Sequence, residues 1–401
     1  MQLVESSNTH YNAVEEIIVQ AMKDFERIVG RAYKPIEYYY YGKTEPTIAI
    51  IAMGSGVKVV DTTLQKLESE QACLIGLRMF RPWNAKTFMA ALPKSIKRIA
   101  VLDRTKESGS QGEPLYLDVV TSLMTQRRYD IFVAGGRYGL GSKDFTPRMV
   151  NAIISNMLRK NVADIQHPFT VGITDDVTKL SLSLGRPINT LPEDVTQCVF
   201  WGFGSDGTVG ANKETIKMIG DYHKDMSVQA YFEYDAKKSS GWTVSHLRFS
   251  PKTHISAPFR VEDGQAGYVA CHNEGYVQAN KFDVVRFLKR RGTFFLNTSI
   301  GSIKDPAERI QALEALVAPK VLRKVALLNA KFYIMDAARL ATKFGLAGRI
   351  NMIWYVTMSA MFTNPTAVVY SISQIVLLCL AVPVYSSGYL EFFLSTMRSP
   401  C

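Results

Sequence analysis

The chain has 401 residues, of which 47% are hydrophobic and 21% are charged, and this composition excludes a disordered or collagen-like protein. Its length predicts two or three domains. The 47 Lys and Arg exceed the 36 Asp and Glu, giving a net charge of +11, but the basic residues form no runs with interleaved aromatics. Nucleic acid is therefore not expected as the main ligand, whereas small phosphorylated ligands suit the charge.

The first twenty residues include Glu5, Glu15 and Glu16 and lack a basic stretch followed by an apolar core. This start does not resemble a signal peptide, and its acids disfavour a transit peptide.

Residues 1–166 read as a first domain in which apolar runs alternate with amphipathic stretches. Strands are predicted at 47–56, 72–80, 96–103 and 129–136. Helices are predicted at 57–70, 85–93, 113–126 and 145–158. Continuous apolar strands separated by helices predict a parallel sheet covered on both faces, which is an α/β fold.

Residues 167–194 are rich in Thr, Ser, Asp and Pro, and we interpret them as a linker. A second α/β domain is predicted at 195–351. Its strands are expected at 197–201, 228–235, 243–249, 267–272, 292–297 and 331–336. Its helices are expected at 211–223, 281–291, 306–317 and 337–346.

The remaining residues, 352–401, form an apolar tail with only two charges, Glu391 and Arg398, where the chain average would give about ten. Within it, residues 367–384 carry no charge and are at the lower limit of length for a membrane span. A membrane anchor is one interpretation. We prefer an aberrant translated end, for reasons that follow from the resemblance below.

The sharpest local motif is Gly202-Phe203-Gly204-Ser205-Asp206-Gly207, between a predicted strand and a predicted helix. It satisfies the G-x-G-x-x-G pattern, in which backbone N–H groups approach a diphosphate at the start of a helix. Glu233 and Asp235 end the next strand, where a ribose-binding acid would stand. Lys237 and Lys238 follow and suit a phosphate better. A tight turn with no ligand is the alternative.

A second glycine-rich stretch, residues 135–141, follows a strand of the first domain. Arg137 with Asp103, Arg104 and Lys106 would make a polar cluster there, where open α/β sheets place function. We prefer a hydrogen-bonded seam between domains.

Elsewhere the sequence offers no metal site and no visible catalytic residue. The cysteines form no CxxC pair and the histidines show no ligand spacing, so neither zinc nor an iron–sulfur cluster is expected. The odd number of cysteines suits a reducing compartment. His246 lies in an alternating stretch and reads as a hydrogen-bonded strand residue. No internal repeat is visible.

Taken together, several stretches resemble the middle of a pyruvate:ferredoxin (flavodoxin) oxidoreductase. The resemblance runs in order from about Tyr11 to Asn351, and it is carried by ALPKSIKRIAVLDRTKESGSQGEPLYLDV, FVAGGRYGLGSKDFTPRMV, FTVGITDDVT, VFWGFGSDGTVGANKETIKMIG, YDAKKSSGWTVSHLRF, YVACHNEGYV, GTFFLN and GLAGRIN.

This resemblance implies a transketolase C-terminal-like first domain and a gamma-type second domain that contributes to coenzyme A binding. The loop contacts it implies are Gly204, Ser205, Asp206, Gly207 and Thr208. Lys237 or Lys238 would meet a phosphate, and Asn297 and Arg349 are further candidates.

The family's pyruvate-binding domain, cysteine ladder and thiamine diphosphate domain have no counterpart here. Thiamine diphosphate, magnesium and iron–sulfur clusters are therefore expected only in other parts of the full enzyme. Because the resemblance breaks off where the tail begins, we interpret the chain as a fragment, and because those cofactor-binding domains have no counterpart, we expect it to be inactive alone.

The full enzyme would convert pyruvate to acetyl-CoA, as a homodimer, with ferredoxin, flavodoxin or an NADP-linked reductase as its electron partner. It would reside in the cytoplasm or an anaerobic organelle, and a membrane anchor in the tail is the disfavoured alternative. An NAD(P)-binding subunit and a non-catalytic scaffold remain as alternatives.

Overall fold

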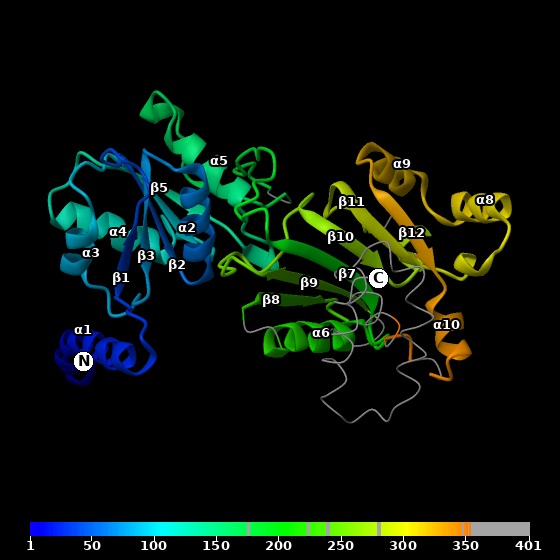
Figure 1. Ribbon diagram of the computed structural model, residues 1–401. Coiled ribbons are helices and arrows are strands. Elements are labelled where there is room, and N and C mark those ends of the chain that lie inside the picture. The colour runs from blue at the N-terminus through cyan, green and yellow to red at the C-terminus, as the bar shows by residue number, and fades with distance from the viewer. Residues whose placement is uncertain are drawn as a thin grey trace. The chain divides into compact units, whose positions relative to one another are not determined.

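The computed structural model describes residues 1–174, 177–222, 225–237, 241–278, 282–346, 349–351 and 353. The chain divides into two compact units (Figure 1). The first comprises Met1–Thr190 with Ser256–Pro258, and the second Leu191–Ile255 with Phe259–Cys401. The fold class predicted from the sequence, two α/β domains, is thereby confirmed. The apolar tail after residue 353 lies outside the described residues.

The first unit is built on a six-stranded sheet in the order β1-β3-β2-β4-β5-β6. The strands are β1 (Ile36–Tyr39), β2 (Ile48–Met53), β3 (Ala72–Leu77), β4 (Arg98–Asp103), β5 (Phe132–Arg137) and β6 (Phe169–Thr170). All neighbouring strands are parallel except β1, which runs antiparallel to β3 at the edge. Strands β2 and β3 are buried almost throughout, as their continuous apolar runs predict.

Helices cover both faces of this sheet. One core joins the sheet to α2 (Ser55–Leu67) and α5 (Pro147–Met157). The opposite core joins it to α3 (Ala85–Ala91) and α4 (Pro114–Thr125). The covered parallel sheet predicted from the sequence is present, with short 3₁₀ turns at Leu140–Ser142 and Val162–Asp164.

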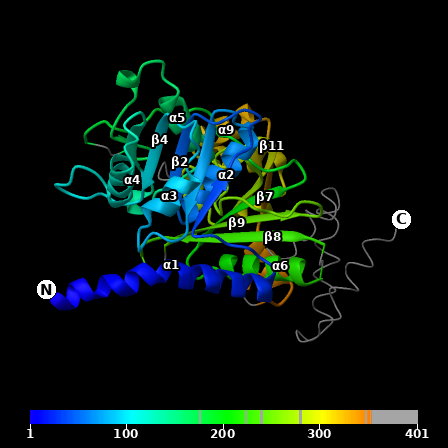
Figure 2. The same cartoon turned by 90° about the vertical axis from the view of Figure 1, so that its left-hand side faces the viewer.

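Two elements at the start of the chain were not predicted. Helix α1 (Gln2–Val29) is one continuous helix that ends at Gly30 in the left-handed conformation and buries no residue (Figure 2). Glu15 accepts a hydrogen bond of 2.5 Å from the Thr87 hydroxyl at the start of α3. Strand β1 is the second unpredicted element, and its polar, Tyr-rich sequence explains why the apolar pattern missed it.

Residues 167–194, predicted as a linker, are more than a connector. Strand β6 pairs with β5, and Thr170 bridges Ser181. The division between the units falls after Thr190, inside the predicted linker. Most of this segment is therefore part of the first unit.

The second unit is built on a mixed sheet in the order β12-β11-β10-β7-β9-β8. Its strands are β7 (Thr196–Phe203), β8 (Ser227–Tyr234), β9 (Trp242–Ser250), β10 (Ala266–Cys271), β11 (Leu288–Asn297) and β12 (Lys331–Met335). Strands β7, β10, β11 and β12 are parallel, whereas β9 runs antiparallel to both β7 and β8.

Helices again cover both faces of the second sheet. Helix α6 (Thr208–Tyr222) and α10 (Ala337–Lys343) pack on one face. Helix α7 (Gly275–Gln278), α8 (Pro306–Leu316) and α9 (Pro319–Leu327) pack on the other, next to a 3₁₀ turn at Ser299–Ser302. Helix α9 was not predicted from the sequence.

The helix predicted at 281–291 is wrong. The structure has a turn there, followed by β11 from Leu288. Val284, Val285, Phe287 and Leu288 are all buried. Because nearly consecutive residues are buried, the segment fills the core as a compact turn and has no exposed helical face.

Candidate functional site

The loop between β7 and α6 holds five of the residues predicted to bind a ligand. Strand β7 ends at Phe203 and α6 begins at Thr208, so Gly204 to Gly207 form the turn. Ser205 and Gly207 have positive φ angles of 75° and 83°. A Cβ at Gly207 would lie 2.8 Å from the Cβ of Asn351, so both conformation and space require glycine there.

Asp206 shapes this loop from within. Its carboxylate accepts the Phe203 N–H at 2.7 Å and the Thr208 N–H at 2.8 Å. Both oxygens are thus used to close the turn and to cap the first residue of α6. Asp206 was predicted as a ligand contact, but its geometry is that of a residue that holds the loop in shape.

The loop keeps some backbone N–H groups available. The Gly204 N–H donates to the Gly241 carbonyl at 2.7 Å, and the Asp206 N–H donates to Phe203 at 3.0 Å. The N–H groups of Ser205 and Gly207 hydrogen-bond to no described residue. Two free donors therefore lie beside the start of a 15-residue helix, an arrangement that favours an anion.

A buried chain of polar groups supports the start of α6. The hydroxyl of Thr208 lies 2.7 Å from Nδ1 of His272, which follows β10. Burial lowers the pKa of His272 to about 3, so the imidazole is neutral near pH 7. The Asn297 amide donates to the His272 carbonyl at 3.0 Å and accepts the Ala337 N–H at 3.1 Å. Asn297 thus ties together the ends of β10 and β11 and the start of α10.

The other predicted ligand residues come from two further segments. Lys237 is exposed, in the turn between β8 and β9, and the Gly241 carbonyl of this turn contacts the loop. Lys238 lies outside the described residues. Arg349 is exposed and stands two residues before Asn351, which lies against Gly207. The structure therefore brings the neighbourhoods of Lys237 and Arg349 to the loop.

Sequence reasoning missed His272, Gly241 and Asn351. None of them belongs to a local motif, and each reaches the loop through tertiary structure. The available signal was that all three lie in stretches that carry the resemblance: His272 in YVACHNEGYV, Gly241 in YDAKKSSGWTVSHLRF and Asn351 in GLAGRIN.

Side chains close most of the second glycine-rich stretch, residues 135–141. A Cβ at Gly136 would lie 2.2 Å from the Phe169 ring, and one at Gly139 would lie 2.7 Å from Nε of Arg104. Gly136 and Gly139 thus make room for neighbouring side chains, whereas a Cβ at Gly141 would meet nothing within 4 Å.

The polar residues around that stretch bind locally. Asp103 accepts the N–H groups of Leu115 and Tyr116, both at 3.1 Å, at the start of α4. Nε of Arg137 lies 3.6 Å from Oε1 of Glu113, and Nζ of Lys106 donates to the Glu107 carbonyl at 2.7 Å. The predicted cluster is thus divided among separate contacts.

The dinucleotide alternative does not fit the strand order. In that fold, the strand after the glycine-rich helix lies directly beside the strand before it. Here β9 separates β7 from β8. Glu233, one of the proposed ribose acids, binds Nε2 of His246 at 2.7 Å and Nε of Arg260 at 2.9 Å. His246 is buried, as expected for a hydrogen-bonded strand residue, and burial lowers its pKa.

Comparison with known proteins identifies the relatives. The family model "Pyruvate ferredoxin/flavodoxin oxidoreductase" matches residues 197–375. Pyruvate:ferredoxin oxidoreductase from Moorella thermoacetica is 44% identical over 87% of this chain and 28% of its own length. The chain is related to the pyruvate:ferredoxin/flavodoxin oxidoreductases.

Two further relatives carry different names for their reactions. The mitochondrial pyruvate dehydrogenase [NADP(+)] of Euglena gracilis is 43% identical over 88% of this chain and 19% of its own length. The pyruvate-flavodoxin oxidoreductase of Enterobacter agglomerans is 43% identical over 87% of this chain and 28% of its own length. The chain therefore spans less than a third of the length of each of these relatives.

The family match covers all the predicted ligand residues, from Gly204 to Arg349. It also continues to residue 375, beyond Asn351, where the resemblance was expected to end. The match thus includes part of the tail. Apart from Ile353, the tail lies outside the described residues.

The described residues do not fit an iron–sulfur cluster. Cys73, Cys198 and Cys271 are buried and free, and burial raises the pKa of each thiol above its ordinary value. No group of three or more His, Cys, Asp or Glu side chains in the described part of the chain could hold a metal ion. Among the same residues, no helix is both long and apolar enough to cross a membrane. The apolar segment 367–384 is not among them.

Proposed function

We propose that the loop Gly204–Thr208 binds phosphate groups of coenzyme A, and that the chain serves the oxidative decarboxylation of pyruvate to acetyl-CoA. The observation that carries this proposal is the pair of free N–H groups of Ser205 and Gly207 beside the start of α6. Phosphate oxygens accept such N–H groups, and the helix dipole favours their charge.

The roles of the surrounding residues follow from their contacts. Asp206 holds the turn, and His272, neutral near pH 7, holds the hydroxyl of Thr208 at the start of the helix. Lys237 and Lys238 would bind a peripheral phosphate such as the 3′-phosphate of coenzyme A. Arg349 and Asn351 would close the loop from the opposite segment.

The remaining chemistry belongs, in this proposal, to other parts of the enzyme. Thiamine diphosphate with magnesium would stabilise the carbanion formed from pyruvate, and iron–sulfur clusters would carry the electrons to ferredoxin, flavodoxin or an NADP-linked reductase. The described residues contribute binding and orientation of coenzyme A, and none of them is assigned to bond making.

Titration calorimetry tests the proposal with coenzyme A, NADH and NADPH added separately to the full chain. We expect heat from coenzyme A alone. Gly207→Ala should abolish it, since the added methyl group meets Asn351 and the residue needs a positive φ. Gly210→Ala is the matched control, because a Cβ at Gly210 meets nothing within 4 Å. Heat from a nicotinamide nucleotide, or equal coenzyme A binding by both variants, would contradict the proposal.

A further inference from the structure

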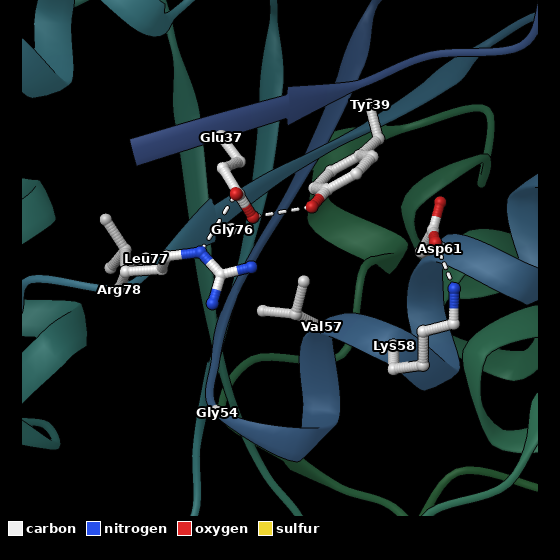
Figure 3. A pocket seen from close by; sticks show the side chains of 9 residues that line it. All are labelled: Glu37, Tyr39, Gly54, Val57, Lys58, Asp61, Gly76, Leu77 and Arg78. Atoms are coloured by element: carbon white, nitrogen blue, oxygen red, sulfur yellow. Dashed lines mark hydrogen bonds and ion pairs between the residues drawn. The ribbon is translucent and has the colours of Figure 1, made fainter. Parts of the chain in front are cut away.

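The first unit contains a cavity of its own. It has a volume of about 500 Å³ and lies where β2 and β3 end and α2 begins (Figure 3). Edge strand β1 forms one wall with Glu37 and Tyr39. Carboxyl ends of parallel strands are where α/β sheets place ligands, and this volume suits a small metabolite.

The acidic groups of the cavity are already occupied. The two oxygens of Glu37 accept Nε of Arg78 at 2.8 Å and the Tyr39 hydroxyl at 2.5 Å. The two oxygens of Asp61 accept the Tyr41 hydroxyl and Nζ of Lys58, the latter at 3.0 Å. Every carboxylate oxygen at this site thus has a donor from the protein itself.

The cationic side chain of Arg78 has unused hydrogen-bond donors. Glu37 binds Arg78 only through Nε, and the ring of Tyr33 lies 4.2 Å from the guanidinium carbon. The two terminal nitrogens of Arg78 hydrogen-bond to no described residue, and Figure 3 shows the guanidinium on the side of Val57 and Gly54. A guanidinium that is held through Nε and has both terminal nitrogens free can bind a carboxylate with two hydrogen bonds.

The balance of charge selects the kind of anion. Arg78 and Lys58 are matched by Glu37 and Asp61, so the formal charges at the cavity sum to zero. Because the site has no surplus of positive charge, its two carboxylates would repel a dianion. A monoanion requires only the free donors of Arg78. Val57, Leu77 and the ring of Tyr39 offer apolar surface for the rest of a ligand.

We propose that this cavity binds a small organic monocarboxylate, with the terminal nitrogens of Arg78 binding the carboxylate and Lys58, which lines the same cavity, adding positive charge. The start of α2 faces the same space: Gly54 has a φ of 61° and open space where a Cβ would be. All residues of this site belong to the first unit, whereas the loop Gly204–Thr208 belongs to the second.

Ligand-observed ¹⁹F NMR tests this site on the full chain, with trifluoroacetate as the monoanion, difluoromethylphosphonate as the dianion and trifluoroethanol as the neutral probe. Trifluoroacetate should broaden in the presence of the protein, and acetate should displace it. Arg78→Gln should weaken trifluoroacetate binding about tenfold, as expected for losing a charge-assisted pair. Lys58→Gln provides a second variant with an exposed side chain, and a smaller loss is expected.

Arg81→Gln is the matched control. Arg81 is similarly exposed and paired, with Asp118 at 2.7 Å, but it does not line the cavity. It should bind trifluoroacetate like the unchanged chain. Equal binding by Arg78→Gln and Arg81→Gln, with folding confirmed by circular dichroism, would place the anion elsewhere. Stronger displacement by the phosphonate than by acetate would overturn the monoanion assignment, and no broadening at all would overturn the site.

Discussion

The two glycine-rich turns of this chain look alike in sequence and differ in structure. In residues 135–141, Gly136 and Gly139 lie against the side chains of Phe169 and Arg104, although Gly139 and Gly141 also have positive φ angles. In residues 204–207, Ser205 and Gly207 have positive φ angles, and their N–H groups hydrogen-bond to no described residue. Glycine spacing predicts that other atoms come close to the backbone in both turns. The surrounding side chains decide whether those atoms belong to the protein or to a ligand.

The largest expected effect is on the closed turn. Gly136→Ala would place a methyl group 2.2 Å from Phe169, which is fully buried, and overpacking of this kind costs roughly 1–3 kcal/mol of unfolding free energy. Chemical denaturation of the first unit measures the loss. Gly185→Ala is the control, because nothing lies within 4 Å of its Cβ. Coenzyme A binding should stay unchanged in both variants; a loss in Gly136→Ala alone would link the two turns.

The second prediction concerns acid. The pKa of His272 is about 3 in the folded chain, against an ordinary 6.5, so the unfolded state binds the extra proton between these values. Stability should therefore fall as pH drops below about 6.5, by up to about 1.4 kcal/mol per pH unit from this group. His272→Gln should flatten the slope measured by denaturation from pH 6.5 to 5. His254→Gln, an exposed histidine, should keep it. Equal slopes would refute the assignment.

A smaller effect is expected from replacing Asp206 in the turn at residues 204–207, which we call the open turn. Asp206→Ala removes the acceptor for two N–H groups and should cost roughly 1 kcal/mol, the range of a lost helix cap. Asp206→Asn keeps one acceptor oxygen and should lose less. Thermal denaturation measures both. If Asp206→Ala abolishes coenzyme A binding without changing stability, Asp206 contacts the ligand directly.

The smallest effect is expected at the lysines beside the open turn. Replacing Lys237 and Lys238 with Ala should weaken coenzyme A binding roughly threefold to fivefold, because the exposed Lys237 has its charge screened by solvent. Dephospho-coenzyme A should bind the unchanged chain and the double variant almost equally. If affinity for both ligands falls alike in calorimetry, the lysines do not read the 3′-phosphate.

The sequence predicted the buried parts of the fold well. Strands such as β2 and β3 are continuous apolar runs, and their burial leaves the pattern unambiguous. Helix α1 and strand β1 escaped prediction because α1 buries no residue and β1 is largely polar. The false helix at 281–291 shows the converse: a dense apolar stretch can fill a core as a turn.

The site was only partly readable from the sequence. Glycine spacing located the loop, since positive φ angles leave a local signature. The structural roles of Asp206 and Asn297 were hidden, because a carboxylate or amide that binds its own backbone has the same letters as one that binds a ligand. His272 and Asn351 reach the loop from distant segments, and no local pattern encodes that contact.

The most direct test of the central claim is a ¹H–¹⁵N NMR titration of the full chain with coenzyme A. The amide signals of Ser205 and Gly207 should shift downfield as their N–H groups gain phosphate acceptors, while those of Gly139 and Gly141 in the closed turn should not move. NADH should leave all four signals in place. Shifts confined to Gly139 and Gly141, or unchanged Ser205 and Gly207 signals at saturating coenzyme A, would contradict the assignment of the loop.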